Sequence, residues 1–259
     1  MTCSTITGNN SYMTDDHDDE LAEHLDPLRD AYHESFIDNP AHRDFLVHRS
    51  TALLCIDMQY LDAAPGHGVF RDAERSGVSL EAQRYYFDRL ESMVLPNTRQ
   101  LQDSFRSHHL EVIHTRIQSL TRDGRDRGKG HRRLGLLAPP GSREADFIER
   151  VAPLPERDEI IINKTASGVF SSTNLHYVLK NLGIESLFIV GVYTNECVET
   201  TVRDACDLGY LVTVVEDCCA TVTPELHNAS LATLRDRYAR IMTLSEAIAV
   251  LNRFLPVEK

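Results

Sequence analysis

A chain of 259 residues is within the size range of one large α/β domain. Its hydrophobic content of 42% and charged content of 25% are ordinary for a globular protein, and its net charge of −12 disfavours nucleic acid as a partner. Six cysteines without a CxxC pair, no run near the roughly 20 apolar residues of a membrane helix and no secretory signal at the start predict a cytoplasmic protein with free thiols and no membrane partner.

Residues 1–48 are predicted to be an N-terminal extension, and residues 49–259 a single domain. The first residues are polar, and residues 18–36 have the pattern of a polar helix with a weak stripe of leucines. Such an arm packs either on its own domain or on a neighbouring subunit.

The domain alternates apolar strands with amphipathic helices. Strands are predicted over residues 51–57, 111–116, 159–164, 187–190, 211–215 and 240–243. Helices are predicted over 80–105 with an interruption near Pro96, and over 142–150, 174–182, 198–208, 224–238 and 245–254, with a turn at 167–170. This order indicates an α/β fold, a mostly parallel sheet covered by helices on both faces.

A long loop is predicted over residues 118–140. Residues 121–133 are basic and rich in glycine, which leaves two interpretations, an RNA or phosphate site and a surface loop or lid. The stretch has no interleaved aromatic residues and contains two aspartates, which favours the loop.

Three chemically reactive residues are placed at the ends of three predicted strands. Asp57 ends the first strand, Lys164 ends the third, and Cys197 lies between the fourth strand and its helix. Ligands of parallel sheets bind beyond the carboxyl ends of the strands, so the three side chains are expected to converge. Asp57 can accept the thiol proton, and Lys164 and the helix N-terminus favour the thiolate of Cys197.

Structural roles are the alternative for each of these residues. Asp57 is then a loop cap and Lys164 a surface residue. The remaining cysteines are expected to be small buried side chains, and they are Cys3, Cys55, Cys206, Cys218 and Cys219.

Three motifs resemble those of the isochorismatase-like cysteine hydrolases. They are LCIDMQ at residues 54–59, NKTASGVFSSTN at 163–174 and GVYTNECVETTVRDA at 191–205, and the resemblance covers roughly residues 50–250. It implies a three-layer Rossmann-like fold, a catalytic triad of Asp57, Lys164 and Cys197, a cis peptide bond between Val192 and Tyr193, and an oxyanion hole formed by the backbone N–H groups of Tyr193 and Cys197. It also implies a homo-oligomer such as a tetramer.

Departures from the family pattern narrow the expected chemistry. Nicotinamidases of the family bind a metal through an Asp-x-His element, which is missing after residues 114–116, so no metal and no cofactor are expected. Cys197 favours amide cleavage over isochorismatase-type ether hydrolysis. The motifs look most like the ureide-cleaving members, with biuret or triuret hydrolysis as the leading reading and ureidoacrylate or carbamoylsarcosine hydrolysis, another reaction of the family, or a non-catalytic binding protein as alternatives.

Candidate substrate-binding residues follow from their places beside the strand ends. Gln118 can both donate and accept hydrogen bonds to a ureide, whereas Arg116 binds either a carboxylate or a structural acid. Asn195 and Glu196 flank Cys197, and Glu196 either holds amide N–H groups or caps the helix. The aromatic candidates for the pocket walls are Phe170 and Tyr60.

Overall fold

The structure is a computed structural model that describes Tyr32 and residues 39–255. The predicted helix over residues 18–36, apart from Tyr32, and Cys3 lie outside the described residues. Within the described part of the chain, no helix has the length and the apolar character needed to cross a membrane.

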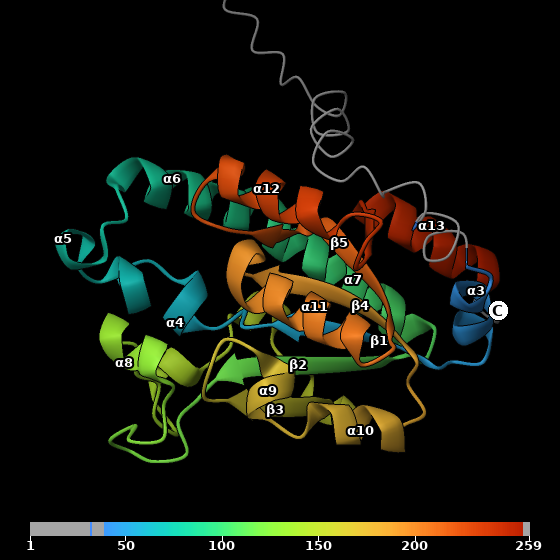
Figure 1. Cartoon of the computed structure of the whole chain (residues 1–259), viewed down its shortest axis with the longest axis horizontal. Helices are drawn as coiled ribbons and strands as arrows, with labels where there is room; N and C mark the ends of the chain where they lie inside the picture. Colours follow the sequence, from blue (N-terminus) through green and yellow to red (C-terminus); the bar gives the residue numbers. More distant parts are fainter. Residues whose placement is uncertain (1–31, 33–38, 256–259) are drawn as a thin grey trace, which may run out of the picture.

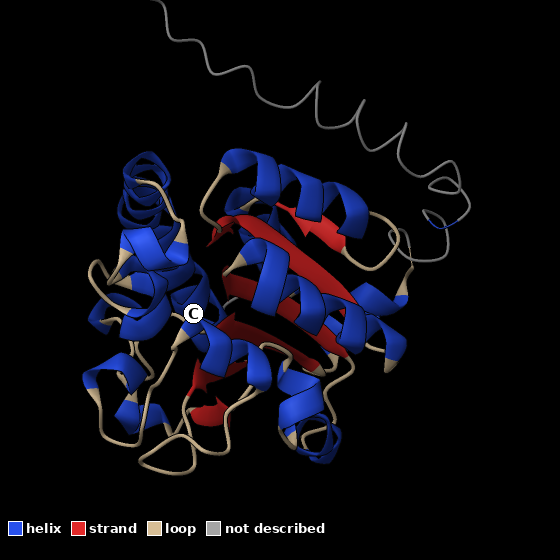
Figure 2. Cartoon of the chain, turned by 60° about the vertical axis from the view of Figure 1, so that its left-hand side comes forward, coloured by secondary structure: helices blue, strands red, loops and turns tan. Residues whose placement is uncertain are grey.

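Six parallel strands form one sheet in the order β3-β2-β1-β4-β5-β6. Their bounds are β1 Thr51–Ile56, β2 Glu111–Ile117, β3 Ile160–Lys164, β4 Ser186–Val192, β5 Leu211–Ala220 and β6 Arg240–Met242. Figure 2 shows the strands as a twisted fan with helices on both sides. The predicted α/β fold with a parallel, doubly covered sheet is confirmed.

Helices bury both faces of the sheet against separate cores (Figure 1). On one face lie α3 (Ala41–Val47), α6 (Leu80–Arg89), α7 (Leu95–Ser107) and α13 (Leu244–Phe254), and on the other lie α9 (Val169–Ser172), α10 (Leu175–Asn181), α11 (Glu199–Asp207) and α12 (Pro224–Leu234). Side chains of β1 alternate between the two cores, with Leu53 and Cys55 in the first and Leu54 and Ile56 in the second. Burial on both faces explains why the central strands β1 and β4 are almost entirely apolar.

Short helices and turns connect the strands and the longer helices. They are α4 (Tyr60–Ala63), η1 (Gly68–Phe70), α5 (Ala73–Ser76), α8 (Lys129–Leu134), η3 (Arg143–Ala145), η4 (Glu149–Val151), η5 (Pro155–Arg157) and the π-helical turn η6 (Thr194–Val198). A second π-helical turn, η2 (Leu90–Val94), joins α6 to α7, and Pro96 lies in the first turn of α7. The expected interruption near Pro96 is therefore a π-turn rather than a break.

Three predicted elements differ from the structure. The helix expected over residues 142–150 is wrong, because Phe147 forms a β-bridge with Gln59 and the Ile148 N–H donates to the Met58 carbonyl, which leaves only the turns η3 and η4. The helix expected over residues 224–238 ends at Leu234, and Asp236 has a φ of 63°. The basic loop contains the helix α8.

Candidate active site

The three reactive residues lie at one edge of the sheet. Asp57 follows β1 and adopts a left-handed conformation with a φ of 52°, Lys164 is the last residue of β3, and Cys197 lies in the turn η6 directly after β4. Because β3, β2, β1 and β4 are neighbouring parallel strands, their carboxyl ends meet there.

The ammonium group of Lys164 joins the other two side chains. Its Nζ lies 2.7 Å from Asp57 Oδ2 and 3.3 Å from Cys197 Sγ, and it also donates to the Ala166 carbonyl at 3.0 Å. The Thr115 hydroxyl donates to Asp57 Oδ1 at 3.0 Å. Asp57 and Lys164 are fully buried and Cys197 is 4% exposed, so the alternatives of a surface lysine and of an isolated loop cap do not describe this arrangement.

Burial and the neighbouring acids disfavour ionisation of the Cys197 thiol. Burial, the charges of Asp57 and Asp62 and a hydrogen bond to Asp57 raise the pKa of Cys197 well above its usual value, although Lys164 acts in the opposite direction. Burial by itself lowers the pKa of Lys164, but Asp57 and Cys197 outweigh it and raise the pKa. Burial therefore opposes ionisation of the Cys197 thiol, whereas the charged ammonium of Lys164 favours it.

Gln59 and Gly191 fix the strand ends that carry the site. The Gln59 amide donates to the carbonyls of Ile117 at 2.9 Å and Glu144 at 2.8 Å and accepts from the Ile117 N–H at 2.5 Å. Gly191 has a φ of 129°, and a Cβ there would lie 2.1 Å from the carbonyl oxygen of Ile56. Only glycine lets β4 approach β1 this closely before the turn.

A buried hydrogen-bond network holds the turn that carries Cys197. The Thr194 hydroxyl lies 2.9 Å from His227 Nδ1, and the Ser230 hydroxyl donates to the Thr194 carbonyl at 3.2 Å. The peptide bond between Val192 and Tyr193 is cis, as the family resemblance implied. The N–H groups of Tyr193 and Cys197 thus belong to one supported turn.

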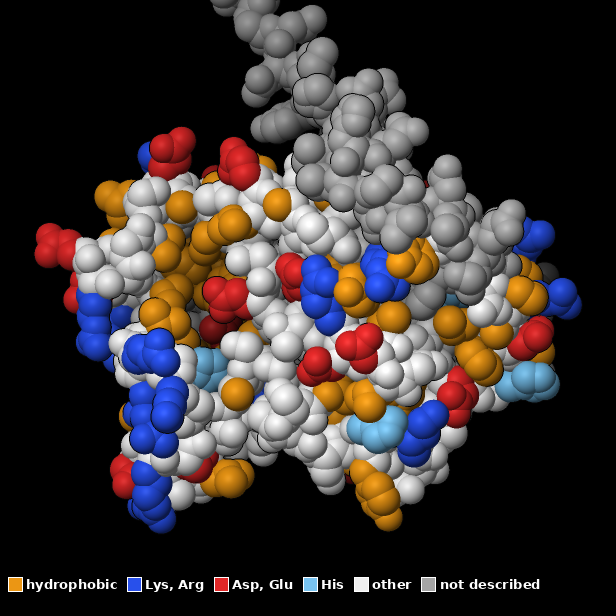
Figure 3. Space-filling view, viewed as in Figure 1, with side chains coloured by type: hydrophobic (Ala, Val, Ile, Leu, Met, Phe, Trp, Pro, Cys, Tyr) orange, Lys and Arg blue, Asp and Glu red, His pale blue; other side chains and the backbone are white. Residues whose placement is uncertain are grey.

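A cavity of about 260 Å³ opens onto Cys197. Its lining comes from α4, α8, η6 and the segments around them, and the residues are Asp62, Val69, Ser76, Val78, Ile117, Gly130, His131, Leu134, Leu136, Ser167, Tyr193, Asn195, Glu196, Cys197, Thr221, Val222 and Leu226. In Figure 3 this end of the molecule is hollowed, with hydrophobic side chains over the upper wall of the hollow and acidic side chains below them. The dimensions suit a small molecule.

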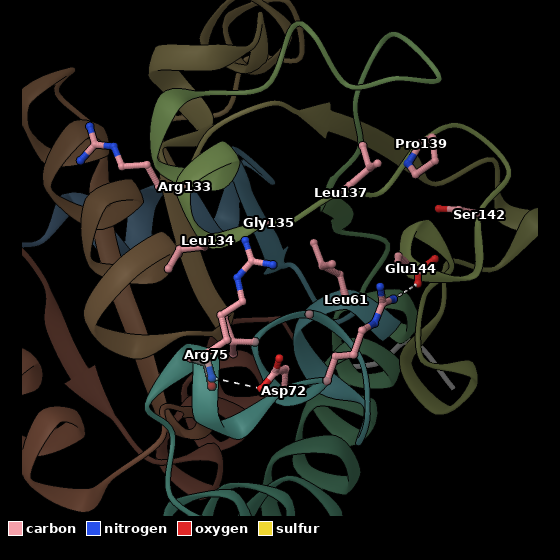
Figure 4. A pocket seen from close by; sticks show the side chains of 14 residues that line it. Leu61, Asp72, Arg75, Arg133, Leu134, Gly135, Leu137, Pro139, Ser142 and Glu144 are labelled. Carbon is pink, nitrogen blue, oxygen red and sulfur yellow. Dashed lines mark hydrogen bonds and ion pairs between the residues drawn. The ribbon is translucent and has the colours of Figure 1, made fainter.

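A second hollow of about 400 Å³ adjoins this cavity, since both are lined by Val69, Ser76 and Leu134. Figure 4 shows Arg75 reaching from α5 toward Gly135. The same view shows Glu144 facing the second hollow, where its carboxylate pairs with Arg71 at 2.7 Å. The outer hollow is therefore the more basic of the two, although its surface is shared with the approach to Cys197.

Two of the six predicted substrate-binding residues line the catalytic cavity, Asn195 and Glu196. Asn195 is oriented by the Thr221 hydroxyl, which donates to its Oδ1. Glu196 is exposed at the cavity, an arrangement compatible with contact to a ligand.

The other four predicted residues are absent from the lining formed by residues 39–255. Arg116 donates to Asn163 Oδ1 at 2.8 Å and to the Ala145 carbonyl at 3.0 Å, so it holds neighbouring segments together. The backbone N–H of Gln118 donates to the Lys164 carbonyl. Phe170 stacks on Tyr210, and the ring of Tyr60 lies under the guanidinium of Arg143. The side chains of Arg116, Phe170 and Tyr60 thus contact structural partners and not the cavity.

Two buried polar residues of the cavity were not predicted, Asp62 and His131. Asp62 follows the Asp57-Met-Gln59 motif by one helical turn, a spacing that offered a weak signal. His131 lies in the basic stretch taken as a loop, where the sequence gives no indication of burial. Within the described residues, no group of three or more His, Cys, Asp or Glu side chains is arranged to hold a metal ion.

Comparison with known proteins relates this geometry to one family. The isochorismatase domain profile matches residues 51–246. The chain belongs to the isochorismatase family of hydrolases. Its fold is that of the family, since a cysteine hydrolase from Pseudomonas syringae superimposes with a TM-score of 0.66 at 22% identity, covering 80% of this chain and 94% of that one.

Two curated relatives of the isochorismatase family differ in what their names state. A probable inactive nicotinamidase of Arabidopsis thaliana is 30% identical over 205 residues, 76% of this chain and 94% of its own length. A ureidoacrylate amidohydrolase of Agrobacterium fabrum is 29% identical over 124 residues, 48% of this chain and 54% of its own length. The family is therefore shown, and the substrate is a separate question.

Proposed function

We propose that this protein is a metal-independent cysteine amidohydrolase that cleaves a C–N bond of a small ureide or amide, with biuret or triuret as the leading substrate. The observation that carries the proposal is the contact of Lys164 Nζ with both Asp57 Oδ2 and Cys197 Sγ at the base of the cavity. A base, a cation and a nucleophile are thereby supplied by three side chains.

The first half of the reaction forms a covalent intermediate. Asp57 takes the thiol proton as Cys197 Sγ attacks the substrate carbonyl carbon, while the charge of Lys164 stabilises the developing thiolate. The negative charge passes to the carbonyl oxygen, which the backbone N–H groups of Tyr193 and Cys197 receive. The C–N bond then breaks, and the leaving nitrogen takes the proton from Asp57.

Water completes the cycle. Asp57 accepts a proton from the water that attacks the thioester or thiocarbamate carbon, the C–S bond breaks, and Cys197 regains its proton. Burial raises the pKa of Cys197, so the proton leaves for Asp57 together with the attack of Sγ and not before it.

Two alternatives have support of their own. The Agrobacterium fabrum relative is named a ureidoacrylate amidohydrolase, which favours a carboxylate-ended ureide. The Arabidopsis thaliana relative is named probable inactive, which favours a non-catalytic binding protein on the same fold. Isochorismatase-type ether hydrolysis is the remaining reaction of the family.

An ammonia-release screen distinguishes these functions. The compounds are biuret, triuret, ureidoacrylate, carbamoylsarcosine, maleamate and nicotinamide. We expect the highest kcat/KM for biuret or triuret. Release from a carboxylate-ended ureide alone would assign the alternative substrate class, and no release from any compound would contradict the amidohydrolase proposal. Assembly into a homo-oligomer stays a prediction, which sedimentation velocity tests.

A further inference from the structure

The catalytic cavity contains two buried polar side chains that the proposed mechanism does not use. Asp62 on α4 is 4% exposed and His131 on α8 is 6% exposed, and both line the cavity with Cys197. Within residues 39–255, neither Asp62 Oδ2 nor His131 Nδ1 has a hydrogen-bond partner. A buried polar atom without a partner carries an uncompensated desolvation cost, so two such atoms in one cavity indicate a ligand that pairs with them.

Asp62 has a fixed position in the cavity wall. The hydroxyls of Tyr86 and Tyr193 both donate to its backbone carbonyl, at 2.9 and 3.1 Å. The rings of these two tyrosines lie 5.4 Å apart in the core that contains α6 and α7, and this packing holds their hydroxyls in place. These bonds fix the backbone from which the Asp62 side chain extends, which limits the positions that its carboxyl can take in the cavity wall.

The charges around the cavity restrict what that ligand is. Asp62 and Glu196 line it, and among the described lining residues there is no lysine or arginine. Lys164 is directed to Asp57, Cys197 and the Ala166 carbonyl. A substrate ending in a carboxylate would place its charge beside two acids, whereas an uncharged carbamoyl group offers N–H donors and a carbonyl acceptor.

Burial and the nearby Asp57 raise the pKa of Asp62 well above its usual value. Burial, with a contribution from Lys164, lowers the pKa of His131, so its ring is neutral. A carboxyl group accepts an N–H in either protonation state. The His131 ring hydrogen-bonds the Thr165 backbone, which leaves Nδ1 for a ligand. The pair is therefore complementary to an amide.

We propose that Asp62 and His131 bind a second carbamoyl group at the far end of the substrate, with an Asp62 oxygen accepting from its N–H. The substrate is then an uncharged compound with two carbamoyl groups, such as biuret, rather than an amide that ends in a carboxylate. This inference rests on the proposed amidohydrolase function.

The test compares biuret with acetylurea, which has nearly the same shape but carries a methyl group in place of the distal NH₂. We expect wild-type kcat/KM to favour biuret by about tenfold or more, since the analogue leaves buried polar groups unpaired. Asp62→Leu removes the acceptor and is expected to abolish this preference, and Asp62→Asn retains an acceptor and is expected to restore part of it.

Thermal melting separates substrate binding from a structural role. Asp62→Leu removes an unpaired carboxyl, so its Tm is expected to equal or exceed that of the wild type. A lower Tm with an equal loss on both compounds would indicate a structural role and overturn the inference. An unchanged preference for biuret in Asp62→Leu would overturn it as well, while leaving the amidohydrolase function intact.

Calorimetry tests the inference through binding affinity, even if the protein hydrolyses neither compound. If neither compound releases ammonia, their binding to Cys197→Ala is compared with their binding to Cys197→Ala carrying Asp62→Leu. Tighter binding of biuret that depends on Asp62 supports the inference, and the absence of that dependence overturns it. The amidohydrolase proposal fails in a different way, namely when no compound in the screen releases ammonia.

Discussion

At the scale of single residues, Lys164 is the link on which the site depends. Its side chain is fully buried, and its ammonium contacts an acid and a thiol that are also buried. Breaking a buried ion pair by removing one partner leaves the other charge without compensation. The contribution of Lys164 to catalysis and its contribution to stability are therefore coupled.

Lys164→Met is expected to abolish turnover and to lower the free energy of unfolding by about 3–5 kcal/mol, because Asp57 stays buried without its cation. The control is Lys180→Met, which removes an exposed ion pair with Glu185 at 3.1 Å and is expected to cost no more than about 1 kcal/mol. Urea unfolding measures both. Similar small losses in the two variants would contradict the role assigned to the buried pair.

The triad could be identified from the sequence because each member follows an apolar strand and belongs to a motif. Asp62 and His131 could not be, because each becomes buried through contacts with segments distant in the chain. The sequence allows Arg116 to bind either a substrate carboxylate or a structural acid, and its hydrogen bonds to Asn163 and Ala145 favour a structural role.

At the scale of elements, an ion pair and a histidine join a helix to two strands. Glu159, directly before β3, accepts from Arg106 of α7 at 2.7 and 3.0 Å and lies 3.0 Å from His114 Nε2 of β2. Burial by itself raises the pKa of Glu159, but hydrogen bonds from His114, Arg106 and the Leu154 N–H outweigh it and lower the pKa to about 2. The network fixes β3, and with it Lys164.

This network predicts a pH dependence of stability. The folded pKa of Glu159 is about 2, below its ordinary value of 4.5, so its contribution is complete above pH 4.5 and is lost as the pH falls toward 2. Between pH 5 and pH 2, wild type is expected to lose about 1–3 kcal/mol more unfolding free energy than Glu159→Gln. Urea titrations across this range measure the difference, and parallel curves would contradict the prediction.

The strands were more predictable than the connecting segments, for a physical reason. A strand buried on both faces is apolar at nearly every position. In β1, every residue after Thr51 is apolar. The segment 142–150 has helical composition but is held extended at Phe147 and Ile148 by pairing with the Asp57-Met-Gln59 motif. The backbone pairing of segments almost ninety positions apart therefore outweighs the local helix propensity there.

At the scale of the whole molecule, the two cores hold the sheet between two helical layers, and α3 belongs to the first of them. Leu46 of α3 is 1% exposed and lies in the same core as α7 and α13, although residues 41–47 were assigned to the extension. We propose that the folded unit includes α3.

Leu46→Ala is expected to lower the free energy of unfolding by about 2–5 kcal/mol, through lost burial and the cavity left behind. The adjacent Val47 is 48% exposed, and Val47→Ala is expected to change the free energy of unfolding by no more than about 0.5 kcal/mol. Chemical denaturation compares the two variants. A negligible effect of Leu46→Ala would show that α3 is separable from the domain.

The most direct test of the central claim, that Cys197 is the nucleophile, is ammonia release by Cys197→Ala on the best substrate of the screen. Turnover is expected to fall by at least about a thousandfold with the fold intact by circular dichroism. Cys206→Ala, which changes a half-buried thiol on the helix after the same turn, is expected to retain wild-type activity. Turnover retained by Cys197→Ala would contradict the account.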